Sequence, residues 1–559
     1  MFKQTPGIEG EPSMMFSRRR ALMAAGAWSC AVGTAAAEPL QSLAPLPAKP
    51  PPYGHARSNR DFSASSNHPA ATEAARRIRL QGGGVLDMYL AALAAAWVVD
   101  PANCSPFGRM QGVYSTGGGY DCLYAPTGIR EEPGSTVPVP GNIAAYFALR
   151  QSDRLQLPLS TILAPARSVA VGGFRPSVGL RAAAQVSAAD MQPDFRRIYL
   201  DDRGGVRARV RNPQLSHLLE VLGRAPDERA FWTELYQQRP GPWALETLLD
   251  NSPRSGPPRD LEVLGRDGRR YRLRTTANLE TWGTWTLLGA AVIAHLQATG
   301  AITDLETAME AYLLATILVL DRIPFSVGLL MPKSASPSVD IDVEAEGRAI
   351  AARVGLLLRA PPAELWAALA ETYFPGEGSK TDDRNTNAFA IASDGDLLSF
   401  TTSLGPWFGS KRAWFGAGLA YSYAMKSQRL FEGQTHDVTE MSPLIIERDG
   451  LPWLAIGAAG SERIYGALTY LLFLKLSLGL PGDMAELMMK PRLFPKDGKV
   501  RIHRDMPQSV QRHLAERGFV LEPTEYDSRK HLGVVNLVEQ VEQGLYRSGA
   551  DPSSSGGAL

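Results

Sequence analysis

The stretch DDRNTNAFAIASDGDLLSFTTS, residues 382–403, decides the fold that this sequence predicts. Two largely apolar runs flank Asp394-Gly395, a dipeptide that favours the two-residue turn of a β-hairpin. The stretch SPLIIERDGLPWLAIGAAG, residues 442–460, repeats the pattern. Hairpins that are apolar on both faces are typical of sheets covered on both sides. Thr386 opens the first hairpin, where it is either a nucleophile exposed by self-cleavage or an ordinary strand residue.

The composition excludes several classes of function. The chain has 559 residues, of which 44% are hydrophobic, and this suffices for a sizeable core. Its 58 basic and 57 acidic residues give a net charge of +1, so no global field favours nucleic acid or anionic lipid. The eight histidines show neither an i, i+4 pair nor a His-Glu-x-x-His spacing, and we expect no metal and no cofactor.

The N-terminus, residues 1–37, resembles an export signal. An arginine cluster, Arg18–Arg20, precedes an apolar run and small residues that end at Ala37. The order of residues 17–22, Ser-Arg-Arg-Arg-Ala-Leu, resembles a twin-arginine signal, which carries proteins that fold before export. We therefore expect a periplasmic protein with no membrane attachment after the signal is removed.

Two other segments differ in composition from the main body. Residues 38–70 are rich in proline and serine and are predicted to form a linker or an extended wrap. The tail, residues 548–559, is predicted to be disordered. Between them the apolar pattern predicts helices over residues 86–100, 159–173 and 304–322 in a mixed α/β body.

Removal of the signal would leave two cysteines, Cys104 and Cys122. In an oxidising compartment a single disulfide between them is one open alternative. It would link nearby segments rather than build a framework, and two isolated cysteines make no metal site.

Six short segments occur in an order and spacing shared with one enzyme family: GGGVLDMYLAALAAAWVVDP at 82–101, VPG at 139–141, LPLSTILAPARSVAVGGFRPS at 157–177, EMSPLIIERDG at 440–450, GAAGSERI at 457–464 and KPRLF at 490–494. Together they resemble the γ-glutamyltransferases (glutathione hydrolases) of the N-terminal-nucleophile hydrolase superfamily. The resemblance implies an α+β fold, a four-layer αββα sandwich. It also implies a large-subunit-like region, residues 71–384, and a small-subunit-like region, residues 385–547.

The same resemblance implies a reaction. The family precursor cleaves itself before a threonine, which leaves two intertwined subunits. The new N-terminal threonine attacks an amide carbonyl with its hydroxyl, its own α-amine acts as base, and the acyl group passes to water or to an amine. Backbone N–H groups of a glycine pair hold the oxyanion.

The hairpin departs from the family at its first residues. Counting back from the Asp394-Gly395 turn places Asn385 on the nucleophile and Thr386 on the threonine that follows it. Asparagine cannot serve as that nucleophile. Because strand side chains alternate, Thr386 is expected to replace it only if a bulge or a different turn shifts the register by one residue.

Compared with the family, the other candidate positions keep one hydroxyl group but lose amide and charged side chains. Ser403 and Gly405 replace the family's Thr-x-Asn, while Ala424 and Ser427 replace the Gln and Asp that bind the substrate's amino group. The remaining candidates are an oxyanion pair and two substrate-binding residues: Gly460, Ser461, Arg130 and Ser442. Arg130 would pair with a substrate carboxylate.

Three hypotheses are consistent with these residues. The first is a divergent self-processing amide hydrolase or acyltransferase, in which Thr386 acts on a small amide or peptide other than glutathione. The second is a non-catalytic descendant that keeps the fold as a binding or accessory protein. The third, glutathione hydrolysis, is disfavoured by the lost clamp. Self-cleavage, the substrate, the pathway, any partner and the oligomeric state stay open.

Overall fold

The computed structural model describes residues 55–129, 137–151, 153–276, 280–323, 341–370, 372, 374, 386–420, 436–525, 532–553 and 556–559. All of these belong to one compact unit that spans residues 43–559. None of the helices in the described ranges is long and apolar enough to cross a membrane. The same ranges hold no group of three or more His, Cys, Asp or Glu side chains that could bind a metal ion.

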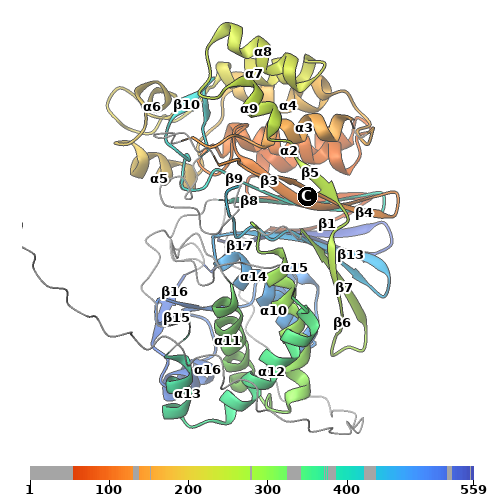
Figure 1. Ribbon diagram of the computed structural model, residues 1–559, viewed down its shortest axis with the longest axis vertical. Coiled ribbons are helices and arrows are strands. Elements are labelled where there is room, and N and C mark those ends of the chain that lie inside the picture. The colour runs from red at the N-terminus through yellow and green to blue at the C-terminus, as the bar shows by residue number, and fades with distance from the viewer. Residues whose placement is uncertain are drawn as a thin grey trace, which may run out of the picture. The chain divides into compact units, whose positions relative to one another are not determined.

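Two seven-stranded sheets of described residues face each other at the centre of this unit (Figure 1). The first sheet has, in order, β1 (His55–Arg60), β18 (Leu545–Ala550), β17 (Val534–Glu542), β13 (Leu451–Ala459), β12 (Leu444–Arg448), β7 (Arg270–Thr275) and β6 (Arg259–Leu264). The second has β19 (Gly557–Ala558), β2 (Phe62–Ser66), β8 (Thr386–Ser393), β9 (Asp396–Ser403), β3 (Arg109–Thr116), β4 (Gly119–Ala125) and β5 (Arg254–Gly256). Apolar side chains of both sheets, among them Ala390 and Ala455, fill the space between the sheets.

Helices cover the outer face of each sheet (Figure 1). The helices in the part of the chain that packs on the second sheet are α1 (Pro69–Arg79), α2 (Val85–Val99), α3 (Asn142–Gln151), α4 (Leu159–Gly172), α5 (Val178–Ser187), α6 (Pro193–Tyr199), α7 (Pro213–Arg224), α8 (Glu228–Gln238) and α9 (Leu245–Asp250). Those on the side of the first sheet are α10 (Gly283–Leu296), α11 (Leu305–Arg322), α12 (Val343–Arg359), α13 (Pro362–Leu369), α14 (Arg463–Leu472), α15 (Met484–Met488) and α16 (Gln508–Glu516). The predicted four-layer αββα sandwich is confirmed.

Shorter elements complete the described chain: the 3-10 turn η1 (Gln297–Thr299), the π-helical turn η2 (Phe473–Ser477), the ribbon of β10 (Ala413–Trp414) and β11 (Ala417–Gly418), and a small sheet of β14 (Leu493–Lys496), β15 (Lys499–His503) and β16 (Leu521–Thr524).

The predicted hairpin is present as β8 and β9. Its ladder runs without a register shift from the pair of Thr386 with Ser403 to the pair of Ser393 with Asp396. Asp394 and Gly395 have φ of 55° and 89°, the left-handed conformation that a two-residue turn of this kind requires. A bulge, one of the two ways in which Thr386 was expected to be able to replace the nucleophile, is therefore absent from the described part of this hairpin.

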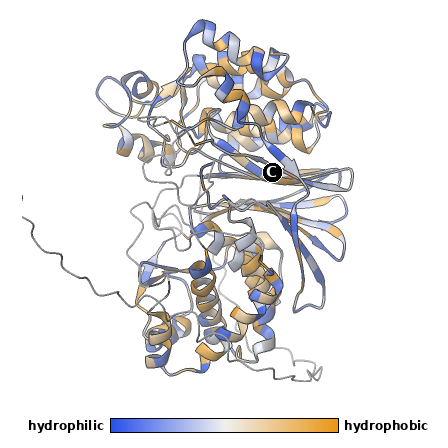
Figure 2. Ribbon diagram, viewed as in Figure 1, coloured by the Kyte–Doolittle hydropathy of each residue, from blue (hydrophilic) through white to orange (hydrophobic). Residues whose placement is uncertain are grey.

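The predicted helices are also present. All residues of α2 are buried, as the nearly continuous apolar run indicates, and Figure 2 shows how hydrophobic residues gather in the helices beside the sheets. Helix α11 begins after Asp304, whose carboxylate accepts a hydrogen bond from the backbone N–H of Thr307 at 2.8 Å. The predicted helix over residues 159–173 is α4.

Both predicted irregular segments contain strands. The segment 38–70 was predicted as a linker or wrap, but its described part forms β1 and β2, and β2 pairs with β8. The tail, residues 548–559, was predicted to be disordered, and this is wrong for its described residues, because β18 ends at Ala550 and β19 pairs with β2. Segments of Ser, Gly and Ala carry little apolar signal, but their small side chains fit between closely packed strands.

The alternative of a disulfide is also wrong, since both cysteines have free thiols. The Cys104 thiol donates to the carbonyl of Asp100 at 3.6 Å, whereas Cys122 lies in β4 and contacts the carbonyl of Pro257. The two thiols lie in separate environments.

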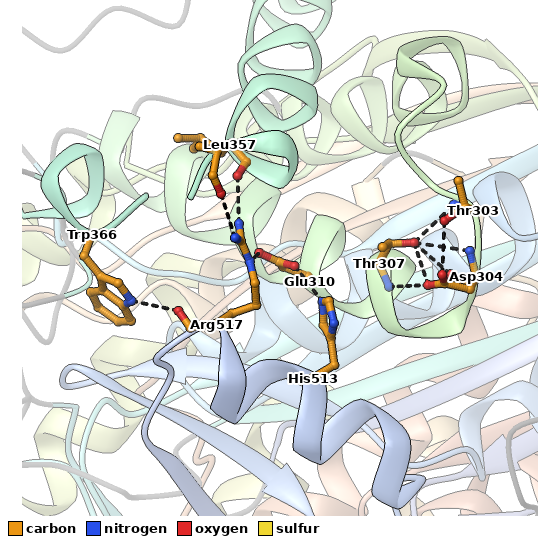
Figure 3. A network of polar contacts seen from close by, with 9 residues as sticks. Thr303, Asp304, Thr307, Glu310, Leu357, Trp366, His513 and Arg517 are labelled. Carbon is orange, nitrogen blue, oxygen red and sulfur yellow. Dashed lines mark hydrogen bonds and ion pairs between the residues drawn. The ribbon is translucent and has the colours of Figure 1, made fainter. Parts of the chain in front are cut away.

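A polar network ties the helices of the first sheet's outer layer together (Figure 3). The buried carboxylate of Glu310 in α11 accepts hydrogen bonds from His513 at 2.7 Å and from Arg517 at 2.6 Å. The Arg517 guanidinium also donates to the carbonyls of Leu357 and Ala360 at the end of α12. One buried carboxylate thus connects α11, α12 and the α16 region.

Candidate active site

Thr386 is the first residue of β8, and its side chain faces the other sheet. The pairing of β8 with β9 places Ser403 directly across from it, so both side chains lie on one face. Ser399, on the same face, donates its hydroxyl to the Ile456 carbonyl of β13 at 2.8 Å. A Cβ at Gly457 would lie 3.3 Å from the Cβ of Ala388. The Thr386–Ser403 pair therefore lies at the open end of the hairpin, far from the turn, and on the face that points toward the other sheet.

Asn387 points the opposite way. Its side-chain amide donates to the Asp100 carboxylate at 2.7 Å and contacts the Cys104 sulfur at 3.3 Å, next to the end of α2. Burial, with a smaller effect of the Asp100 carboxylate, raises the pKa of the Cys104 thiol well above its usual value. This thiol is protonated and packs as a small buried group.

Asn67, just after β2, holds the start of β8 through its side chain. Its amide nitrogen donates to the Thr386 carbonyl at 3.0 Å, and its oxygen accepts from the N–H of Ala388 at 3.3 Å. From the other sheet, Asn536 donates to the same oxygen at 2.6 Å, and Asn536 accepts from Ser65 at 2.9 Å. A chain of carboxamides thus fixes the backbone of Thr386 across the gap between the sheets.

The predicted oxyanion turn, Gly460-Ser461, follows β13. Gly460 has φ 128° and Ser461 has φ 58°, so two successive residues have positive φ, and such outliers cluster at functional sites. Arg463 donates its Nε to the Gly460 carbonyl at 2.8 Å, and Ser461 donates its hydroxyl to Glu440 at 3.3 Å. The turn is therefore held from both sides.

The course of β13 brings this turn toward Thr386. Ala455 lies in the inter-sheet core with Ala390, and Gly457 lies beside Ala388. The two strands therefore run in opposite directions, so that later residues of β13 lie beside earlier residues of β8. The residues that follow, Ala459 and the Gly460 turn, lie toward the Thr386 end of the hairpin.

A buried ion pair lies next to the turn. Glu462 accepts a hydrogen bond from Lys496 of β14, and both side chains are almost fully buried. Burial alone would raise the pKa of Glu462, but Lys496 and Arg463 together hold the pKa of this carboxyl below its usual value. The Glu462 carboxylate therefore stays ionised, and its contact with Lys496 anchors the segment after the turn.

Ser442 lies on the other side of its sheet. Its hydroxyl is 2.6 Å from the hydroxyl of Thr286 in α10, in the outer helix layer. The structure does not bring it to the Thr386–Ser403 pair. Four other positions considered from the sequence lie outside the described residues: Arg130, Asn385, Ala424 and Ser427.

One polar pair beside the hairpin had no signal in the sequence. Arg109 of β3 lies opposite Ser403 in the ladder, and its guanidinium donates to Asp437 at 2.8 Å and to the Val438 carbonyl at 3.1 Å. Gln111, two residues on, donates to the Met441 carbonyl at 2.6 Å. A buried ion pair therefore lies beside Ser403, one strand further from Thr386, and only the strand register reveals it.

Comparisons with known proteins show which proteins this chain resembles. Residues 359–559 match the family described as Gamma-glutamyltranspeptidase. Cephalosporin acylase from Bacillus halodurans is 17% identical, with 93% of this chain and 98% of that chain covered and a TM-score of 0.68. LmbA2991HD is also 17% identical, with 90% and 99% covered and a TM-score of 0.70.

Similarity to the gamma-glutamyltranspeptidase of Helicobacter pylori is weaker, with 17% identity, 52% and 90% coverage and a TM-score of 0.40. A comparison with curated proteins finds no similar sequence. At these sequence identities the solved structures establish the fold alone. The family match relates residues 359–559 to the gamma-glutamyltranspeptidases. Residues 359–559 thus resemble the γ-glutamyltranspeptidase family, and the chain as a whole has the N-terminal-nucleophile hydrolase fold.

Proposed function

We propose that this protein is a self-processing amide hydrolase or acyltransferase in which Thr386 is the nucleophile. The observation that carries the proposal is the face on which the Thr386 side chain lies. The hydroxyl shares the inter-sheet face with Ser403, and the turn at Gly460 lies toward the same end of the hairpin. The hairpin reaches this arrangement with a regular ladder closed by the two-residue Asp394-Gly395 turn, which puts Thr386 on the same face as Ala388 and so toward the other sheet.

Self-processing would break the peptide bond between Asn385 and Thr386 and release the α-amine of Thr386. That amine takes the proton of the Thr386 hydroxyl as the oxygen attacks an amide carbonyl. The amide C–N bond then breaks, the proton passes to the leaving amine, and an ester to Thr386 remains. Water or a second amine attacks this ester, which releases the acyl group and restores the hydroxyl.

The surroundings of Thr386 support these steps. Asn67 fixes the Thr386 carbonyl and the next N–H along the strand, so the free amine and the hydroxyl start from a rigid strand end. The Gly460-Ser461 turn supplies backbone N–H groups for the oxyanion, and these remain when serine replaces the family's second glycine. The buried Arg109–Asp437 ion pair holds β3 beside Ser403.

The substrate class that we propose is an acyl group in amide linkage, without the γ-glutamyl head group. Ala424 and Ser427 carry no charge to bind an ammonium group, and Gly405 replaces the family's asparagine. The similarity to a cephalosporin acylase supports an acyl amide. The corresponding test compares chromogenic anilides that carry γ-glutamyl, glutaryl and neutral acyl groups.

We expect turnover of an anilide without the ammonium group, loss of that turnover in Thr386→Ala, and no turnover of the γ-glutamyl anilide. Rapid release from the γ-glutamyl anilide would contradict the inferred change of substrate. Absence of turnover with every anilide, in a chain that is also uncleaved, would instead favour a non-catalytic binding or accessory protein.

We also propose that the protein acts in the periplasm after export by the twin-arginine route. The support is the arginine cluster and apolar run of residues 1–37. Replacing Arg18 and Arg19 by lysine should leave the protein in the cytoplasmic fraction. Unchanged recovery from the periplasmic fraction would refute this route.

A further inference from the structure

A cavity of about 560 Å³ lies between α6, the segment before α7 and the end of α8. Five arginines line it, Arg197, Arg207, Arg209, Arg211 and Arg239, together with one acidic residue, Asp194. The whole chain has a net charge of +1. The positive charge at this cavity is therefore a local concentration and does not follow from the overall composition.

Most of this charge is not neutralised. Within the part of the chain that the structure describes, Arg197 pairs with Asp194 at 3.4 Å, and the other four arginines form no ion pair. Exposed arginines elsewhere in the same helix layer do pair, as Arg167 does with Glu220 at 2.7 Å. Four like charges around one hollow repel each other, and an anion in the hollow would relieve the repulsion.

Two of the side chains are held in place by backbone carbonyls. Arg207 donates its Nε to the carbonyl of Arg197 at 3.1 Å, and Arg209 donates its Nε to the carbonyl of Gly172 at 2.9 Å. Each guanidinium retains its two terminal nitrogens for another acceptor. Because the stems are already ordered, a ligand would lose less of its binding free energy to side-chain ordering.

We propose that this cavity binds a small polyanion that carries two or more phosphate groups. The planar guanidinium offers paired N–H donors that match phosphate oxygens, and several arginines around one volume suit more than one phosphate. The site is separate from Thr386, and the inference goes beyond the proposed function.

The site nevertheless contacts the segment that follows the catalytic hairpin. Asn212, which also lines the cavity, donates to the Gly416 carbonyl at 2.8 Å. In α6, the ring of Phe195 lies 5.6 Å from the ring of Phe408, measured between centroids. A ligand in the cavity would therefore stabilise elements that pack on residues 404–420.

Titration calorimetry with tripolyphosphate tests the proposal. We expect binding at low ionic strength that weakens as salt rises, and at least a tenfold loss of affinity in the double variant Arg211→Gln, Arg239→Gln. The matched control is Arg229→Gln, an exposed arginine of α8 that pairs with Glu246 at 2.9 Å outside the cavity. This control should bind as the unchanged protein does, and the thermal transitions of all variants should coincide.

Equal affinity in the double variant and the control would overturn the assignment of the cavity. Equal affinity for citrate at matched charge would overturn the preference for phosphate. Binding to vesicles of anionic phospholipid with none to tripolyphosphate would indicate a membrane surface instead, and would also refute the proposal. Absence of all anion binding at low salt would do the same.

Discussion

Replacing Asn67 with aspartate tests whether this side chain positions Thr386. The change keeps the size of the side chain and its acceptor oxygen. It removes the N–H donor, whose nitrogen Nδ2 lies 3.0 Å from the Thr386 carbonyl oxygen. The acceptor contacts to the N–H of Ala388 and to Asn536 remain available. The substitution therefore removes one hydrogen-bond donor at the start of β8 and keeps the acceptor.

The expected cost follows from that geometry. Removing the donor from a buried hydrogen bond costs about 1–3 kcal/mol. Carboxylate repulsion against the Thr386 carbonyl acts in the same direction. We expect Asn67→Asp to lower the free energy of unfolding by roughly 2–4 kcal/mol. If half of this appears in the transition state for processing, the rate falls on the order of tenfold.

The assay follows two fragments on a denaturing gel over time and, separately, chemical unfolding by tryptophan fluorescence. Asn536→Asp is the matched control, because it removes the donor to Asn67 and leaves the hydrogen bond from Asn67 to the Thr386 carbonyl in place. Asn536→Asp should destabilise the protein, but its processing rate should stay above that of Asn67→Asp. Wild-type rates and unfolding midpoints for Asn67→Asp would refute the positioning role.

Three further predictions concern packing, titration and backbone strain. Gly112→Ala should be poorly folded, since a Cβ there would lie 2.1 Å from the ring of Phe400, whereas Gly457→Ala, with its nearest contact at 3.3 Å, should shift the thermal transition little. Hydrogen bonding to its buried carboxylate partner raises the pKa of His513 above 6.5, so protonated His513 contributes stability that is complete below pH 6.5 and is lost as pH rises through the folded-state pKa. His513→Gln should therefore destabilise the protein more at pH 5.5 than at pH 9 in chemical unfolding, and an equal loss at both would contradict this. Ser461→Gly should retain processing and Ser461→Val should lose it, because φ of 58° suits glycine and strains a β-branched residue; equal activity of the two variants would count against a role of the turn.

Local signals in the sequence predicted the parts of the fold that have strong local causes. The Asp394-Gly395 turn adopts the positive φ that its residues favour, and α11 begins within one residue of the predicted start of its helix. The strand segments β2 and β19 were missed because their small side chains give no apolar alternation. Their pairing depends on β8 and on each other, which lie far away in the sequence.

The candidate site could also be predicted only in part, because only some of its residues belong to local motifs. Thr386, Ser403 and the Gly460 turn could be found because motifs along the chain mark them. Arg109 and Asn67 could not, because their roles arise from cross-strand register and from contacts between segments hundreds of residues apart. The strand register also shows that the Thr386 hydroxyl lies on the inter-sheet face, a point that counting residues alone left open.

The central claim is that Thr386 becomes a new N-terminus. Intact-mass measurement and N-terminal sequencing of the purified mature protein test it directly, with Thr386→Ala as the control. We predict two fragments, the smaller beginning at Thr386, and a single uncleaved chain for the alanine variant. A single chain for the unchanged protein, or cleavage at another bond, would contradict the account.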